Sequence, residues 1–110
     1  MEMTYRAENR HLTIRLKGEL DHHAARAVME SIDRCMEQNL PSKTVLDMEG
    51  LTFMDSSGIG ILLNRYKQIK ASGGTVSFYG ASSQIRRILK LGGMLTLMPQ
   101  FESKEEAIYR

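Results

Sequence analysis

Apolar and polar side chains alternate strictly over residues 11–17 of the chain. This period of two predicts a strand with one buried face. Residues 3–9 form a second β-like run, and the Asn9-Arg10 pair between the two runs suits a tight turn. We therefore expect the chain to open with an antiparallel hairpin.

Three later stretches repeat apolar side chains every three or four residues, the spacing of a helix with one buried face. They cover residues 21–38, 56–72 and 82–91. Asp21, Asp55 and one of Ser82 and Ser83 stand at the three starts, where their side chains can accept hydrogen bonds from the free N–H groups of the first turn. Paired glycines end the second and third stretches.

Short apolar runs between these helices predict the remaining strands. They lie at residues 44–48, 75–79 and 95–98, and a last helix is expected at 103–109. The element order is then ββαβαβαβα. Because right-handed crossovers place successive strands parallel, we predict a single α/β domain over residues 1–110. It has a mixed, mostly parallel sheet of about five strands, with an antiparallel N-terminal strand and about four helices.

The composition favours a cytoplasmic protein over the secreted, membrane and nucleic-acid-binding classes. The 15 basic and 13 acidic side chains leave a net charge of +2, too balanced for a nucleic-acid-binding surface. Neither an apolar signal-peptide region nor a run of 18 apolar residues occurs, so we expect no membrane contact. The single cysteine, Cys35, lies among apolar residues at helical spacing, which predicts a buried thiol in a reducing compartment.

Residues 54–60, Met-Asp-Ser-Ser-Gly-Ile-Gly, place two hydroxyls and a carboxylate at the start of the second helix. Asp55 is the predicted N-cap, which leaves the Ser57 hydroxyl free in the first turn. The helix N-terminus would tolerate a phosphate on that hydroxyl. The added charge would oppose the binding of an acidic or apolar partner surface. Ser56 then supports the helix start. Capping alone is the structural alternative, and the spacing leaves it open.

The surroundings of this motif favour a partner surface. Loops that follow parallel strands emerge at one edge of the sheet, so Asp21 should lie close to Asp55. Gly58 and Gly60 each cost roughly 1 kcal/mol of helix propensity relative to alanine, which we attribute to close approach of another backbone. Ile61 falls outside the buried stripe, and we expect it to be exposed beside the hydroxyls.

The residues support a catalytic, nucleotide-binding or metal-binding site less well than they support a partner surface. A serine nucleophile elbow needs the pattern G-x-S-x-G, and the glycine in front of the serine is missing here. A small serine hydrolase that uses His22 or His23 is nevertheless one alternative. Gly58-Ile59-Gly60 is not a dinucleotide fingerprint, and no G-K-[ST] follows a glycine loop. The adjacent histidines lack matched ligands, so we expect no metal and no cofactor.

Three strings of sequence resemble a known family. Residues 18–23 read Gly-Glu-Leu-Asp-His-His, residues 53–60 contain the Asp-Ser-Ser-Gly core, and residues 65–70 read Arg-Tyr-Lys-Gln-Ile-Lys. Together they closely resemble the anti-sigma factor antagonists of the STAS domain family. Many such antagonists share the Asp-Ser-Ser-Gly core, whereas the other two strings point to the sporulation branch. The resemblance covers nearly the whole chain, and the mixed sheet that it implies agrees with the periodicity.

The resemblance implies a partner-switching mechanism. The unphosphorylated protein would bind an anti-sigma factor that is also a serine kinase, and so release the sporulation sigma factor F. The kinase would use ATP to phosphorylate Ser57, the second serine of the motif, and a metal-dependent PP2C-type phosphatase would remove the phosphate. The protein would be a substrate and a ligand, not an enzyme, and would not itself bind nucleic acid. The expected partner-binding residues are Asp21, Asp55, Ser56, Ser57, Gly58 and Ile61. A STAS module that binds a partner or a nucleotide without phosphorylation is the alternative.

Overall fold

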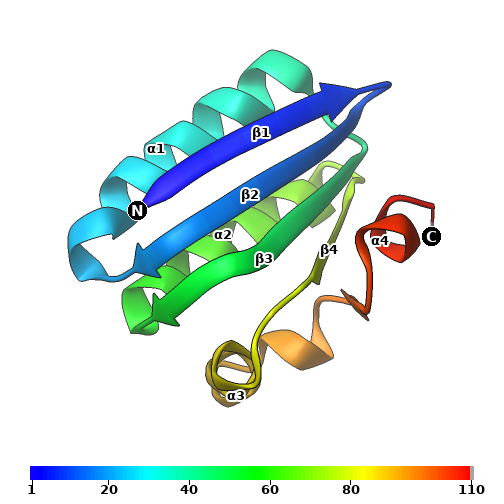
Figure 1. Ribbon diagram of the computed structural model, residues 1–110. Coiled ribbons are helices and arrows are strands. Elements are labelled where there is room, and N and C mark those ends of the chain that lie inside the picture. The colour runs from blue at the N-terminus through cyan, green and yellow to red at the C-terminus, as the bar shows by residue number, and fades with distance from the viewer. Residues whose placement is uncertain (110) are drawn as a thin grey trace.

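A five-stranded mixed sheet organises residues 1–109, the part of the chain that the computed structural model describes. The strands lie in the order β1-β2-β3-β4-β5, with β1 antiparallel to β2 and all other neighbours parallel (Figure 1). The predicted order of strands and helices is confirmed. The elements are β1 Glu2–Glu8, β2 His11–Leu20, α1 His22–Asn39, β3 Lys43–Met54, α2 Ser56–Ala71, β4 Thr75–Tyr79, α3 Ser83–Leu91, the 3-10 helix η1 Met94–Thr96, β5 Gln100–Phe101 and α4 Lys104–Tyr109.

Most of the core lies on one face of the sheet, under α1 and α2 (Figure 1). The helix α1 buries Val28, Ile32 and Cys35, as its apolar spacing predicts. They join strand residues such as Ile14 and Phe78, which are fully buried. Full burial of one such aliphatic or aromatic side chain is worth about 1.5–3 kcal/mol. A smaller apolar cluster on the opposite face is covered by α4. No helix within residues 1–109 is long and apolar enough to cross a membrane.

The strand β3 is longer than the run at 44–48 predicts, because it continues to Met54. Its second half pairs with the end of β2, in a register that shifts on either side of Lys17 and Gly18. The pairing ends with Leu20 opposite Met54. The N–H of Asp55 then donates to the carbonyl of Leu20 over 3.4 Å. The two loops at the carboxyl edge therefore leave the sheet side by side.

The predicted strand at 95–98 is wrong. Residues Met94–Thr96 form a 3-10 helix, and the last strand is the short β5 that follows it. The carbonyl of Met94 accepts from the N–H groups of Leu97 and Met98 over 3.2 and 2.9 Å, so this segment is closed on itself. Met94 and Met98 are buried and Leu97 is exposed, a helical spacing of four that a short apolar run does not distinguish from a strand.

Candidate functional site

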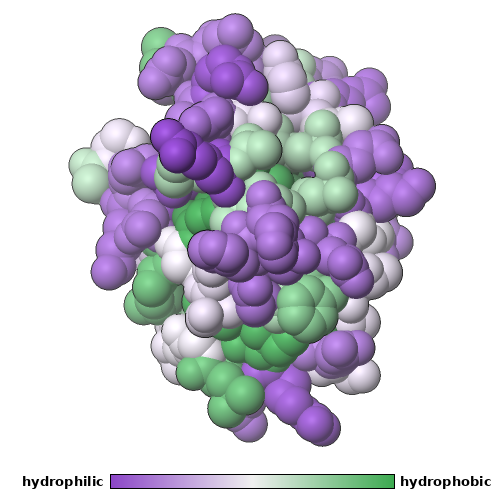
Figure 2. All heavy atoms as spheres, turned by 90° about the vertical axis from the view of Figure 1, so that its left-hand side faces the viewer, coloured by the Kyte–Doolittle hydropathy of each residue, from purple (hydrophilic) through white to green (hydrophobic). Residues whose placement is uncertain are grey.

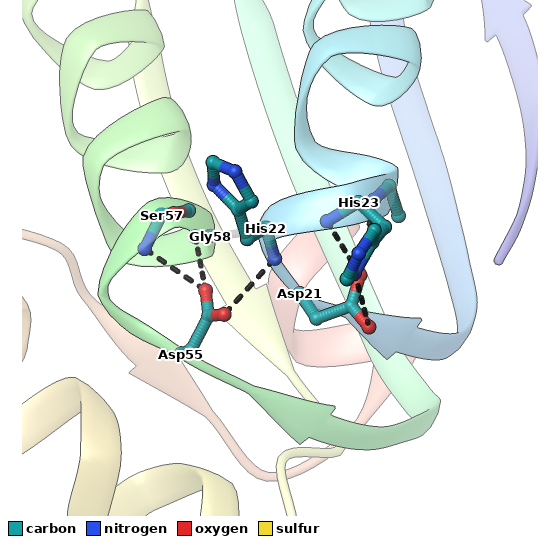
Figure 3. Close-up of polar contacts among 7 residues, drawn as sticks. Asp21, His22, His23, Asp55, Ser57 and Gly58 are labelled. Carbon is teal, nitrogen blue, oxygen red and sulfur yellow. Dashed lines mark hydrogen bonds and ion pairs between the residues drawn. The ribbon is translucent and has the colours of Figure 1, made fainter.

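The carboxylate of Asp55 connects the starts of two helices. Asp55 has an extended backbone between β3 and α2, and its Oδ1 accepts from the N–H groups of Ser57 over 2.9 Å and Gly58 over 3.3 Å. Its Oδ2 accepts from the N–H of His22, the first residue of α1, over 2.9 Å (Figure 3). One side chain thus satisfies free N–H groups of both helices.

Asp21 caps α1 in the same way. Its Oδ1 accepts from the N–H groups of His23 and Ala24, both over 3.0 Å (Figure 3). The hydrogen bond from Ala24 is the largest cause that holds the pKa of Asp21 below its usual value. Both predicted N-caps are confirmed, and so is the expectation that Asp21 and Asp55 share the carboxyl edge of the sheet. The backbone contribution of His22 left no signal in the sequence, because every residue except proline can supply a main-chain N–H.

The two serines lie on different faces of α2. Ser56 is exposed and stands one helical turn before Gly60, which has no neighbouring atom within 4 Å of the position that a Cβ would take. Ser57 is half-buried and stands one turn before Ile61, which is buried. Of the two serines, Ser56 is therefore the residue more accessible to solvent.

The expectation that Ile61 is exposed is wrong, since only 8% of it is accessible. One turn further on, the same side of α2 carries an ion pair with α1. Arg65 Nε donates to Asp33 Oδ1 over 3.0 Å, and the Arg65 side chain is only 12% exposed. Ile61, one turn before Arg65, therefore lies on the side of α2 that approaches α1. The Ile61 side chain is consequently almost fully buried within the domain.

The two glycines of the motif differ in their surroundings. A Cβ at Gly58 would lie 2.7 Å from the carbonyl oxygen of Leu20 and 2.7 Å from Cγ of Met54. The predicted close approach of another backbone is therefore confirmed for Gly58. It is wrong for Gly60, where the space is open.

A shallow groove of about 640 Å³ begins beside Asp21 and runs between α1 and the start of β1. Apolar side chains such as Met1, Met3 and Val28 line it together with Glu19 and His23. The rings of His22 and His23 are exposed and meet edge to face, with centroids 5.9 Å apart. The edge that holds the serines therefore also carries carboxylates, imidazoles and an open groove.

A family model described as the STAS domain matches residues 2–107. The chain is 35% identical over 97 residues to the anti-sigma F factor antagonist of Paenibacillus polymyxa, and this match covers 88% of the chain and 83% of that relative. Two solved structures are similar at 31% identity over 97% of the chain. One is the anti-sigma factor antagonist SpoIIAA in its unphosphorylated form, with a TM-score of 0.83 and 93% of its chain covered. The other is the Bacillus cell fate determinant SpoIIAA in its phosphorylated form, with a TM-score of 0.75 and 96% of its chain covered. The chain therefore belongs to the STAS domain family, in the group of its anti-sigma factor antagonists.

Proposed function

We propose that this protein is a phosphoserine switch that controls a sigma factor. Unphosphorylated, it binds an anti-sigma factor that is also a serine kinase, and the sporulation sigma factor F is released. The observation that carries the proposal is the serine pair Ser56-Ser57, held at the start of α2 by Asp55. The similarity to an anti-sigma F factor antagonist, and to the cell fate determinant SpoIIAA solved in its phosphorylated form, supports the proposal.

A phosphate on this pair would act chiefly through charge. It adds about −1.5 to −2 charge at neutral pH. The N–H groups of Ser57 and Gly58 already donate to Asp55, so they are not free to neutralise the phosphate. The new charge therefore adds to those of Asp21 and Asp55 at the same edge. A partner surface that fits neutral hydroxyls then binds more weakly, while the positive end of the α2 dipole offsets part of the added charge and the domain stays folded.

Two hydroxyls compete for the role of phosphoacceptor. The family resemblance assigns the phosphate to Ser57. The exposure of Ser56 supports the other hydroxyl, because a kinase must bring the acceptor oxygen into its own active site. Both serines are therefore tested singly.

The remaining parts of the cycle follow from the same proposal. The bound kinase consumes ATP, phosphorylates the serine and dissociates. A PP2C-type phosphatase removes the phosphate and restores binding. In this cycle the protein is a cytoplasmic substrate and ligand that needs no cofactor of its own, and Asp21 and Asp55 meet basic groups on the kinase.

The test is phosphorylation by the kinase encoded in the same genome. Incubation of the protein with kinase and ATP should add one phosphate, seen as a single mass increase and placed by peptide fragmentation. Either Ser56→Ala or Ser57→Ala should abolish it, and the variant that does so identifies the acceptor. Ser83→Ala is the matched control, because Ser83 is also an exposed first residue of a helix. No incorporation, or incorporation that survives the Ser56→Ala and Ser57→Ala double variant, would overturn the proposal.

A binding module without a phosphoswitch is the second candidate, and the groove beside Asp21 favours it. A ligand or partner segment seated there would not sense the serines. Replacement of the identified acceptor by aspartate separates the two functions. A large loss of kinase affinity supports the switch, whereas affinity equal to that of the wild type supports the module.

A further inference from the structure

The strand β1 is a long and regular edge of the sheet. It lies at one end of the strand order, so its outer side has no strand neighbour within residues 1–109. Its seven residues pair with β2 without a bulge and include no proline and no lysine. Natural proteins use bulges, prolines, lysines or very short strands to keep an edge from pairing with another chain. The opposite edge strand, β5, has only two residues. Of the two edges, β1 is therefore the one that can accept a further strand.

The charges along β1 are complementary to those of a second β1. Along an edge strand every second residue directs its N–H and C=O outward, so two copies related by a two-fold axis pair antiparallel with one residue on that axis. With Thr4 on the axis, Glu2 of each copy lies opposite Arg6 of the other. Moving the axis to Tyr5 would instead place Glu2 opposite Glu8, whose like charges repel. Moving it to Arg6 would bring the two arginines together. Charge therefore selects the register with Thr4 on the axis.

Both members of the Glu2 and Arg6 pair are available for such a contact. Each is exposed, and neither forms an ion pair with any of the residues that the structure describes. Because of the two-fold axis, the pair occurs twice in the interface, once at each end of the paired segment Glu2–Arg6.

The same register brings an aromatic ring to the groove beside β1. Met3 and Tyr5 lie on the face of the sheet that α1 covers, because their partners on β2, Leu16 and Ile14, are fully buried in the core. Met3 lines the groove, and Tyr5 is 49% exposed. Residues directly opposite each other carry their side chains on the same face of a sheet. Tyr5 of a second copy therefore lies against Met3, and a methionine sulfur makes favourable contacts with an aromatic ring.

The helix wall of this groove leaves room for the ring. It is formed by α1, which contributes the small side chains of Ala24, Ala27 and Ser31 to a space of about 640 Å³. Figure 2 shows the side of the molecule at which β1 and α1 begin in Figure 1, and hydrophobic side chains are open to solvent there between hydrophilic ones. A tyrosine ring can therefore enter without displacing a large side chain.

We propose that two copies of this protein associate through β1, antiparallel and with Thr4 on the two-fold axis, so that one sheet runs through both. Main-chain hydrogen bonds between the two edges supply affinity, and the Glu2–Arg6 pairs fix the register. The proposal does not rest on the proposed function, because β2 separates β1 from β3, the strand that leads to the serine pair.

Sedimentation equilibrium at neutral pH and low salt tests the proposal. The mass of the wild type should rise from that of one copy to that of two as its concentration increases. Arg6→Glu places two carboxylates opposite each other, and Glu2→Arg places two guanidinium groups opposite each other. Each variant alone should associate at least tenfold more weakly than the wild type. An equimolar mixture of the two should restore association, because one copy then supplies both carboxylates and the other supplies both guanidinium groups.

Two further variants complete the experiment. Glu8→Arg is the matched control, because it changes the net charge as Glu2→Arg does but lies outside the paired segment, and it should associate as the wild type does. Tyr5→Ser removes the ring that enters the groove and should weaken association at least fivefold. The thermal unfolding midpoint of each variant, measured in dilute solution, separates lost association from lost folding.

Four results would overturn the proposal. The first is a wild type that keeps the mass of one copy up to about 1 mM. The second is a mixture of folded Arg6→Glu and Glu2→Arg that associates no better than either alone. The third is stronger association of Glu8→Arg than of the wild type, which would place Tyr5 on the axis. If a charge variant does not fold, Tyr5→Ser decides, and association within twofold of the wild type is the fourth such result.

Discussion

The N–H of His22 donates to the carboxylate of Asp55, 33 residues later in the chain, over 2.9 Å. The other oxygen of that carboxylate caps α2 through Ser57 and Gly58. The start of α1, with Asp21, is thereby held at a fixed distance from the serine pair. A partner that contacts both loops therefore meets a preformed surface. This lowers the entropic cost of ordering the loops on binding.

Mutation can separate the contributions that the two carboxylate oxygens of Asp55 make to stability. Asp55→Asn keeps a carbonyl oxygen for the α2 cap but turns an amide toward the N–H of His22, and should cost about 1 kcal/mol of unfolding free energy. Asp55→Ala loses both contacts and should cost about 2–3 kcal/mol. Urea denaturation measures both values, with Asp21→Ala as a control that removes a single cap. A fully stable Asp55→Asn would contradict a contribution from the bond to His22.

Gly58 and Gly60 should respond in opposite directions to alanine. Gly58→Ala forces a Cβ to within 2.7 Å of the Leu20 carbonyl oxygen and should destabilise the protein by about 1–3 kcal/mol. Gly60→Ala meets open space and should stabilise it by up to about 1 kcal/mol. Thermal unfolding of the two variants under one condition tests the contrast. If both variants changed the stability in the same direction, the packing around one of these glycines would differ from that in the structure.

The ion pair between Arg65 and Asp33 should contribute more than an exposed pair. The Arg65 side chain is only 12% exposed, and the pair joins two helices, so Asp33→Asn should cost about 1 kcal/mol. The control is Glu30→Gln within the exposed pair of Arg26 and Glu30 on α1, which should cost less than about 0.5 kcal/mol. Denaturant melts at low and high salt measure both. Equal costs would argue that Arg65 holds α2 through packing alone.

Tyr79 should make stability fall in alkaline solution. Burial, followed by the hydrogen bond and charge of Asp47, raises the pKa of Tyr79 above the ordinary value of 10.0. The contribution to stability is fully present below pH 10.0 and is lost as pH rises toward the folded pKa, because only the unfolded chain releases the proton. The free energy of unfolding should fall by up to about 1.4 kcal/mol per pH unit more steeply in the wild type than in Tyr79→Phe.

Urea melts between about pH 9 and 11 measure this difference in slope. Tyr5→Phe is the control, because Tyr5 is 49% exposed on the edge strand. Parallel curves for the wild type and Tyr79→Phe would show that Tyr79 ionises as readily in the folded protein as in the unfolded chain.

Local patterns alone determined most of the fold. Asp21 and Asp55 were predictable as N-caps because a cap depends on N–H groups within three residues of it. The order of helices and strands was predictable because the spacing of apolar residues depends only on neighbouring residues in the chain. Burial of Cys35 followed from the same helical spacing. The tight turn at Asn9-Arg10 also forms, with both residues in the left-handed region.

The tertiary structure decided everything that depends on contacts between distant segments. Ile61 is buried on the side of α2 that carries the ion pair of Arg65 with Asp33, and the Leu20 carbonyl distinguishes Gly58 from Gly60. The hydrogen bond from His22 to Asp55 uses a main-chain N–H, which every residue except proline carries, so no pattern of side chains could predict it. The sequence by itself therefore determined where the helices begin and that two serines stand at one of those beginnings. Only the packing of α2 against α1 decided which faces of that helix remain open to a partner.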